Sequence, residues 1–196
     1  IQALANTQIA NLTTTQAGAL TATNVAALAS TQSASLTGAQ IVAMSLAAAK
    51  AFDSDQIGAF NTTQIKSFSA AQIAAFTAGD VGELTETQVA ALTTTQVGAL
   101  SNTNFAALAD TQVEALTTTQ LTAVSATKIA AMTATQTGAL TSTQIASLST
   151  TQVRAFTNAN LSALDASQSA ALTGAQIASL STGQINSLNA TDVADL

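Results

Sequence analysis

An eight-residue repeat runs through the whole chain, from Ile1 to Leu196, without an insertion or a deletion. Its consensus is (Ile/Val)-x-Ala-Leu-(Thr/Ser)-x-Thr-Gln, as in residues 89–96, VAALTTTQ. The 196 residues divide into twenty-four octapeptides and a final half unit. A repeat this short predicts one structural unit stacked on itself, in which each copy contacts mainly its neighbours. We therefore expect a single repeat array over residues 1–196 with no internal domain boundary.

The eight positions of the unit, numbered from the Ile or Val, carry the signature of a helix start. Position four is apolar in every unit, position five is usually Ser or Thr, and position eight is usually Gln. Thr-x-x-Gln is a capping box, because the hydroxyl accepts from the third helical amide and the Gln reaches back to the cap amide. The apolar residues on either side of the box form a hydrophobic staple. Each octapeptide therefore predicts its own helix start.

In three units position five is alanine, and the residue after it is polar. These pairs are Ala5-Asn6, Ala29-Ser30 and Ala109-Asp110. We expect the capping side chain to have moved by one place in these units.

The distance between successive helix starts limits each helix to about six residues, or roughly 9 Å. A helix that short is unstable alone in water, so it requires a core shared between units. We predict an all-α solenoid or superhelix of very short helices, with one helix in each eight-residue repeat. The apolar residues at positions one and four form its core. Position two, which holds Lys50, Lys66, Glu114 and Arg154, is expected to face solvent.

Two other folds are compatible with an eight-residue period. A single continuous helix fails because eight residues turn about 800°, so its apolar stripe would drift around the axis. A β-solenoid with one short rung per repeat stays open, since Thr-x-Thr is favourable in strands. The apolar positions, however, are three and then five residues apart and do not alternate.

Two places depart from the consensus. Between Ser45 and Lys50 the unit loses its Gln and its aliphatic residue at position one, and three consecutive alanines favour helix, so two short helices are expected to fuse. In the next four units position four is phenylalanine: Phe52, Phe60, Phe68 and Phe76. An exposed aromatic ladder for a sugar is conceivable, but this position is apolar everywhere, so we assign the rings to the core.

Composition removes most catalytic chemistry. Charged residues make up 7% of the chain, and His, Cys, Pro, Trp and Tyr are absent. Without imidazole or thiol there is no usual proton shuttle, nucleophile or soft-metal ligand, so we expect no enzyme and no cofactor. The net charge of −6 with four scattered cationic side chains argues against nucleic acid as a partner. No stretch is long enough to span a membrane, and no signal-peptide pattern opens the chain.

Acidic and hydroxyl side chains provide the remaining candidate sites. Asp53 and Asp55 form the only Asp-x-Asp, but a calcium loop needs more oxygen ligands and Asp53 occupies the cap position. Asp80, Glu83 and Glu86 form a small acidic group that we interpret as a solvated helix end. Ser and Thr are abundant, but no base is present to activate them. We therefore expect no catalytic, cofactor-binding or metal site.

Two resemblances accompany the repeat. The segment 84–92, LTETQVAAL, is similar to the first-helix segment of transcription-activator-like effector repeats, although the second helix and the base-reading loop of that family are missing here. The whole chain resembles the Thr/Ala/Gln-rich short repeats of large secreted or surface proteins of bacteria, such as adhesin-like molecules. The second resemblance implies an extracellular spacer, stalk or fibre component without catalysis.

We therefore expect a non-catalytic structural repeat protein at the bacterial cell surface or outside the cell, which self-associates end-to-end or laterally. An alternative is a surface-binding module that uses regular Thr, Ala and Ser rows to bind ice or a flat polysaccharide. A peptide-binding α-solenoid is the third hypothesis.

Overall fold

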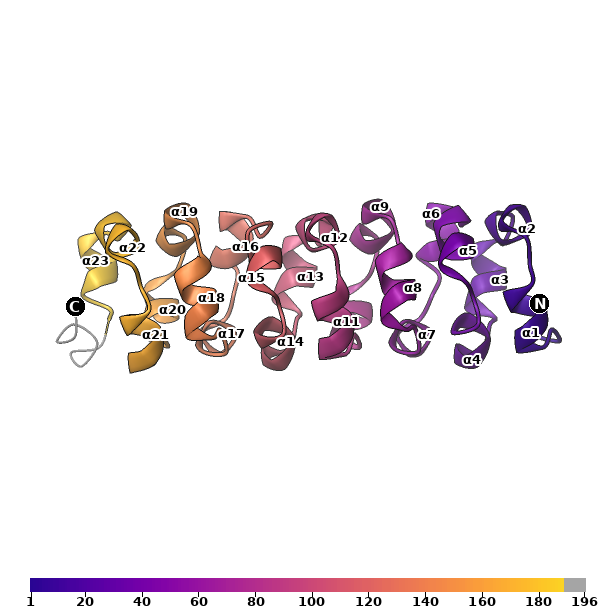
Figure 1. The fold of residues 1–196 in the computed structure, drawn as a ribbon, viewed down its shortest axis with the longest axis horizontal. Coiled ribbons are helices and arrows are strands. Elements are labelled where there is room, and N and C mark those ends of the chain that lie inside the picture. Colours follow the sequence, from indigo (N-terminus) through magenta and orange to yellow (C-terminus); the bar gives the residue numbers. More distant parts are fainter. Residues whose placement is uncertain (189–196) are drawn as a thin grey trace. The chain divides into compact units, whose positions relative to one another are not determined.

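The computed structural model describes residues 1–188 and consists of short α-helices joined by extended linkers (Figure 1). The part of the chain that the structure describes contains 23 helices and no strand. This confirms the predicted all-α solenoid and does not support the β-solenoid. The chain forms two compact units, which we call unit 1 (Ile1–Ala107) and unit 2 (Leu108–Leu196, described to Leu188). The octapeptide register continues across the boundary between them.

The helices have four to six residues each. In unit 1 they are α1 Asn6–Ala10, α2 Thr14–Gly18, α3 Ala22–Ala26, α4 Ser30–Ser33, α5 Gly38–Ala43, α6 Leu46–Ala49, α7 Ser54–Gly58, α8 Thr62–Ser67, α9 Ala70–Ala74, α10 Ala78–Gly82, α11 Glu86–Ala91, α12 Thr94–Ala99 and α13 Asn102–Ala106. In unit 2 they are α14 Asp110–Glu114, α15 Thr118–Leu121, α16 Ala126–Ala130, α17 Ala134–Gly138, α18 Ser142–Ser147, α19 Thr150–Arg154, α20 Asn158–Leu161, α21 Ala166–Ala170, α22 Gly174–Ser179 and α23 Thr182–Ile185.

Most helices start at the capping box that the sequence predicts. At α12 the cap residue Thr93 is extended (φ −72°, ψ 158°), and its hydroxyl oxygen accepts a hydrogen bond from the Gln96 amide at 3.2 Å. Gln96 Oε1 accepts in return from the Thr93 amide at 2.7 Å. The helix ends at Leu100, whose extended backbone (ψ 139°) leads into the next cap. Where the box is present it fixes where the helix begins. In α5, α8, α11, α12, α18 and α22 the C-cap is the apolar residue at position four.

The expected shift of the cap in the alanine units is wrong. Ala5, Ala29 and Ala109 keep the extended cap conformation, and no side chain caps these helices. The Gln half of the box survives, because the Ala29 amide still donates to Gln32 Oε1 at 2.8 Å. The Gln therefore holds the helix start in register, and the polar residue after the alanine simply becomes the first helical residue.

Restoring the missing hydroxyl should stabilise unit 1. We expect Ala29→Thr to raise the free energy of unfolding by about 1 kcal/mol, because the threonine would accept from the Gln32 amide. Ala29 borders an open groove that leaves room for the larger side chain. Urea unfolding followed by circular dichroism measures the change. The reciprocal control, Thr37→Ala at a regular cap, should lose a similar amount, and an unchanged Ala29→Thr midpoint would contradict the role given to the cap.

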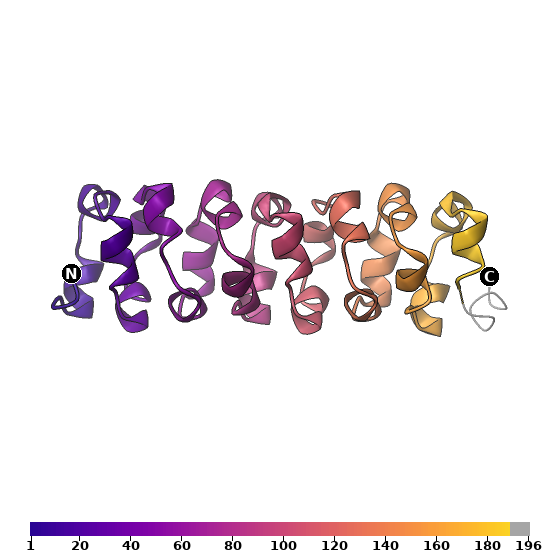
Figure 2. The same cartoon turned by 180° about the vertical axis from the view of Figure 1, so that it is seen from behind.

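Three octapeptides make one turn of the solenoid in each unit. In unit 1, α2 packs on α5, α5 on α8 and α8 on α11, so helices three units apart form one column (Figures 1 and 2). The helices α3, α6, α9 and α12 form a second column and α1, α4, α7, α10 and α13 a third. Unit 2 follows the same rule, with α16 packed on α19 and α19 on α22. One turn therefore takes 24 residues, three times the repeat.

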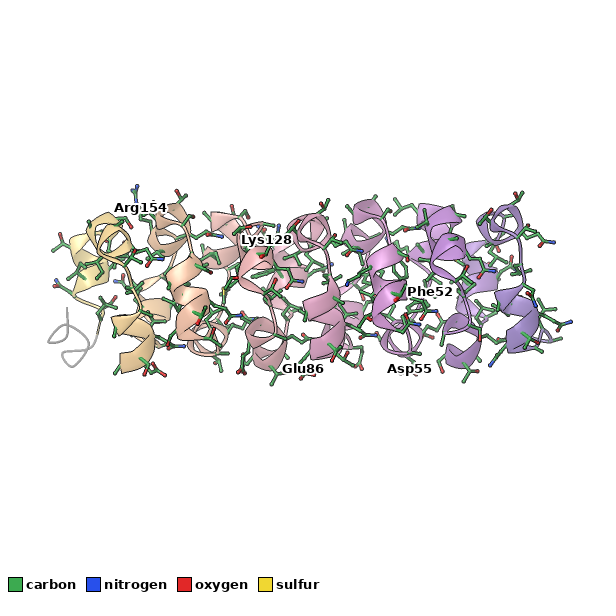
Figure 3. The ribbon with its side chains drawn as sticks, in the orientation of Figure 1. Phe52, Asp55, Glu86, Lys128 and Arg154 are labelled. Atoms are coloured by element: carbon green, nitrogen blue, oxygen red, sulfur yellow. The ribbon has the colours of Figure 1, made fainter. Side chains whose placement is uncertain are left out.

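The side chains at positions one and four fill the interior of both units. Ile57 is 0% and Phe60 3% exposed, and every position-one residue from Ile9 to Ser169 is buried. The four phenylalanines lie in this core, edge to face, with ring centroids 5.1–6.0 Å apart. The assignment of these rings to the core is confirmed. Figure 3 shows Phe52 among the helices of unit 1, whereas Asp55 and Glu86 lie at its periphery.

The expected fusion of helices around 45–50 is also wrong. Helix α5 ends at Ala43, and Ser45 starts α6 by accepting from the Ala48 amide at 3.2 Å. The cap outweighs the helix propensity of the three alanines, because the apolar Met44 at position four is extended and buried in the core. This octapeptide therefore still forms a separate helix that starts at Ser45, although it lacks Gln at position eight.

Some glycines at position two permit close approach between turns. A Cβ on Gly18 would lie 2.8 Å from the Ala43 carbonyl oxygen of the next turn, whereas one on Gly82 would meet nothing within 4 Å. Neither glycine has a positive φ. We expect Gly18→Ala to lower the free energy of unfolding by about 1–3 kcal/mol through overpacking. Gly82→Ala, its matched control, should raise it by about 0.4–1 kcal/mol. Thermal denaturation of the two variants measures both changes. Equal effects on the free energy of unfolding would contradict the close approach of Gly18 to Ala43.

Candidate functional site

The Gln at position eight forms hydrogen bonds in two directions. Besides the capping box, the Gln96 amide nitrogen donates to the Phe68 carbonyl at 2.7 Å and to the Ile65 carbonyl at 2.9 Å. Both acceptors lie at the end of the helix one turn earlier, where the last carbonyls lack regular helical partners. The Ile65 carbonyl also accepts from the Phe68 amide at 3.3 Å. Gln96 is 2% exposed. One side chain therefore joins the start of its own helix to the end of the helix beneath it.

The same bond recurs along each unit, and we call the series the glutamine ladder. Its acceptor is always the position-four carbonyl 28 residues earlier. Described examples are Gln32 to Leu4, Gln40 to Leu12, Gln56 to Leu28, Gln64 to Leu36, Gln72 to Met44 and Gln88 to Phe60 in unit 1, and Gln136 to Leu108, Gln144 to Leu116, Gln152 to Val124, Gln168 to Leu140, Gln176 to Leu148 and Gln184 to Phe156 in unit 2. Asn104 and Asn160 make it with a shorter side chain.

The glutamine ladder gives position eight a role that the capping box alone does not. A capping box accepts Glu as readily as Gln. The ladder needs an acceptor for the cap amide and a donor for the carbonyl, and only an amide side chain supplies both. Glu never occurs at position eight in this chain, and that absence is the sequence signal that could have revealed the ladder.

Among the described residues three units replace the amide at position eight, and a fourth, at Asp192, lies outside them. Ala48 can neither accept nor donate through its side chain. Asp80 is buried and accepts from the Thr77 amide at 2.7 Å and from the Ser54 hydroxyl at 3.3 Å. Lys128 is 6% exposed, and burial lowers the pKa of its ammonium from the ordinary value of 10.5. In Figure 3 Lys128 lies against the helices of unit 2, whereas Arg154 projects away from them.

Lys128 gives stability a dependence on alkaline pH. Its folded pKa is lowered, so between that pKa and about 10.4 the unfolded chain binds a proton that the folded chain does not. The stability of the wild type therefore rises with pH in this window. Lys128→Gln removes the desolvation cost and adds an oxygen for the Ser125 amide, which should stabilise the protein by about 1 kcal/mol near neutral pH. Urea midpoints of both proteins should converge as the pH approaches 10; a constant difference would contradict this.

The structure shows where each of the acidic candidate residues lies. Asp53 caps α7 by accepting from the Gln56 amide at 2.8 Å, as the sequence indicates, and Asp55 is exposed in the first turn. Of the acidic group, Asp80 is buried, whereas Glu83 and Glu86 are exposed at the end of α10 and the start of α11. The solvated-end interpretation therefore fails for Asp80. Within residues 1–188 no group of three acidic, His or Cys side chains could hold a metal ion.

The exposed surface is where a ligand could bind. Position two faces solvent as predicted, since Lys50, Lys66, Glu114 and Arg154 are all exposed. Position seven is exposed in every described unit, and it is usually threonine. In contrast to the position-five hydroxyls, these threonines contribute no side-chain hydrogen bond to the fold in residues 1–188. Their hydroxyl and methyl groups are available to solvent.

Shallow grooves and one apolar patch interrupt this surface. A groove of about 580 Å³ in unit 1 is lined by Gln2, Asn6, Thr31, Gln32 and residues 26–29. A groove of about 540 Å³ in unit 2 includes Asp110 and Thr135. In the described chain, the large apolar side chains left exposed are Val42 (58%) and Leu46 (50%).

Comparison with known proteins identifies a repeat but no relative. A family model described as the ALTTAQ repeat matches residues 49–86. No curated protein matches the chain, and no solved structure does. The match supports a repeat protein; the resemblances to adhesin-like proteins and to transcription-activator-like effector repeats stay predictions. In residues 1–188 no helix has the length and apolar character needed to cross a membrane.

Proposed function

We propose that this chain is a non-catalytic structural repeat segment, a spacer, stalk or fibre-forming scaffold of a secreted or surface protein of bacteria. The observation that carries the proposal is the use of the polar side chains. The polar side chains at positions five and eight form the caps and the glutamine ladder, which joins each turn to the next. In such a chain the repeated hydrogen bonds stabilise the stacking of one turn on the next, which suits a protein that acts as a spacer.

Solution scattering and negative-stain microscopy over a concentration series test the proposal. A spacer or fibre component should remain elongated at every concentration, and self-association should lengthen or bundle the particles as concentration rises. A single compact particle with the dimensions of an ordinary globular domain would overturn it. Antibodies raised against the chain should label intact cells of the bacterium that makes it, and label only permeabilised cells if the localisation is wrong.

The exposed threonines at position seven favour a second candidate, a surface-binding module for ice or a flat polysaccharide. In unit 1 these threonines recur one turn apart, as at Thr7 and Thr31 or Thr63 and Thr87, although other residues interrupt each column. Thermal hysteresis and ice shaping provide the test. Activity that disappears when Thr63 and Thr87, both exposed in unit 1, become Lys would favour this candidate over the spacer, and absence of any hysteresis would remove ice as the ligand.

A further inference from the structure

The four clustered phenylalanines of unit 1 connect octapeptides in a direction that the glutamine ladder does not. A ladder bond joins residues 28 apart, from one turn to the next, and the helix contacts likewise join octapeptides three places apart. The rings connect neighbours along the chain instead. Phe52 contacts Phe60 and Phe68, and Phe68 also contacts Phe60 and Phe76. We call the four octapeptides that carry these rings, residues 49–80, the aromatic clamp.

Outside the aromatic clamp, a regular octapeptide is held mainly by its own contacts with the turns on either side. It contributes a capping box, a ladder bond and two core side chains, as the octapeptide that ends at Gln96 does. In a stacked array the stability is approximately a sum over units and the interfaces between neighbours. Octapeptides next to an opened region can therefore open one after another, eight residues at a time.

Inside the aromatic clamp, an octapeptide cannot open alone without the loss of ring contacts to its neighbours. Opening at Phe52 breaks two edge-to-face pairs, and opening at Phe68 breaks three, with centroid distances of 5.3–6.0 Å. Each such pair adds to the free energy that burial of the ring already provides. The pairs therefore couple the four octapeptides, and segments coupled in this way open as one cooperative unit.

We propose that the aromatic clamp is a single opening unit within unit 1, whose four octapeptides open together and after the octapeptides on either side. In a spacer under tension, such a block acts as a stop that ends the gradual lengthening of the array. The role as a stop rests on the proposed function, whereas the cooperative opening does not.

Native-state hydrogen exchange of the full chain, measured by mass spectrometry in urea below the unfolding midpoint, tests the cooperative opening. Amides of residues 49–80 should share one rate and one urea dependence, and should exchange about fivefold or more slower than those of 1–48 and 81–107. The double variant Phe52→Leu/Phe68→Leu removes every ring pair of the clamp and keeps an apolar core. It should bring the four octapeptides to separate rates, within about twofold of their neighbours. Four separate rates in the wild type would overturn the inference.

Phe156→Leu is the matched control in unit 2. Phe156 is buried at position four, as Phe68 is, but it makes no ring contact within residues 1–188. Its replacement should speed exchange in its own octapeptide only, whereas Phe68→Leu should speed exchange throughout residues 49–80. An effect of Phe68→Leu that stays within residues 65–72 would show that the rings do not couple their octapeptides.

Stretching single molecules in an optical trap tests the role as a stop. The 32 residues of the aromatic clamp should be released in one step, which adds about 110 Å of extended chain, after smaller steps at lower force. The double variant should lose this step. Elongated particles in solution scattering with four separate exchange rates would leave the spacer intact and refute the clamp. A shared exchange rate in compact particles would support the clamp and refute the spacer.

Discussion

Replacing Gln96 by Glu is expected to lower the free energy of unfolding by about 3–5 kcal/mol at pH 7. The carboxylate can still accept from the Thr93 amide, so the capping box survives. It cannot donate to the Phe68 and Ile65 carbonyls, which lie 2.7 and 2.9 Å from the present amide nitrogen. The variant therefore buries a charge against two carbonyl oxygens. Urea and thermal unfolding measure the loss.

Lowering the pH should rescue this variant. Burial beside carbonyl oxygens raises the folded pKa of the new carboxyl above its unfolded value of about 4.3. Between these two pKa values the folded state binds the proton and the unfolded state does not, so stability increases as the pH falls through the folded pKa. The protonated acid can then donate to a carbonyl. A loss of stability that is the same at all pH values would contradict the ladder.

Gln16 provides a matched control in the same tetrapeptide, TTTQ. It makes the capping box with Thr13, at 2.9 Å to the Thr13 amide, but it is exposed and donates to no position-four carbonyl among the described residues. Gln16→Glu should therefore change the free energy of unfolding by less than about 0.5 kcal/mol. An equal loss in both variants would show that the capping box, and not the ladder, requires the amide.

Replacing Phe68 by Ala is expected to cost about 3–5 kcal/mol. Phe68 is 2% exposed and contacts the other three rings of its cluster, with centroid distances of 6.0 Å to Phe52, 5.4 Å to Phe60 and 5.3 Å to Phe76. The lost free energy of unfolding has three sources. The phenyl ring is no longer buried, a cavity remains in its place, and each edge-to-face ring pair contributes about 0.5–1.5 kcal/mol.

The control is Phe68→Leu, which installs the residue that most other units carry at position four. It should cost less than about 1.5 kcal/mol, because Leu keeps most of the buried volume. Calorimetry of the three proteins measures both values. If Ala and Leu are tolerated equally, the rings do not form a packed core.

The sequence predicts the parts of the fold that are local. Thr93 and Gln96 predict a helix start within four residues, and the distance to the next start limits the helix to about six residues. The solvent-facing position two follows from the charged residues that occupy it. These features depend on side chains that contact each other within one octapeptide, so pattern and structure agree.

The features that depend on distant contacts could not be predicted in the same way. The three-unit turn is set by the angle between successive helices, which no residue type encodes directly. The second role of Gln96 requires a carbonyl 28 residues away. The prediction at the alanine units fails for a local reason, since the bond from the Ala29 amide to Gln32 fixes the start of α4 although no hydroxyl is present. The buried Asp80 carboxylate accepts a hydrogen bond from the Ser54 hydroxyl of the preceding turn, a contact between residues 26 apart in the sequence.

The three-unit turn has a consequence for how such a chain changes length. The segment GAL-x-x-TN occurs at Gly18, where α2 ends, and again at Gly98, within α12. These positions are ten octapeptides apart, which is three turns and one further unit, so the two copies stand in different columns of unit 1. After one octapeptide is gained or lost, the ladder bonds that span the change can re-form with the unit that is then three places earlier, but the later units of that array move to another column. The array is thus free to vary its length in steps of eight residues, whereas a binding row along one column survives only changes of twenty-four.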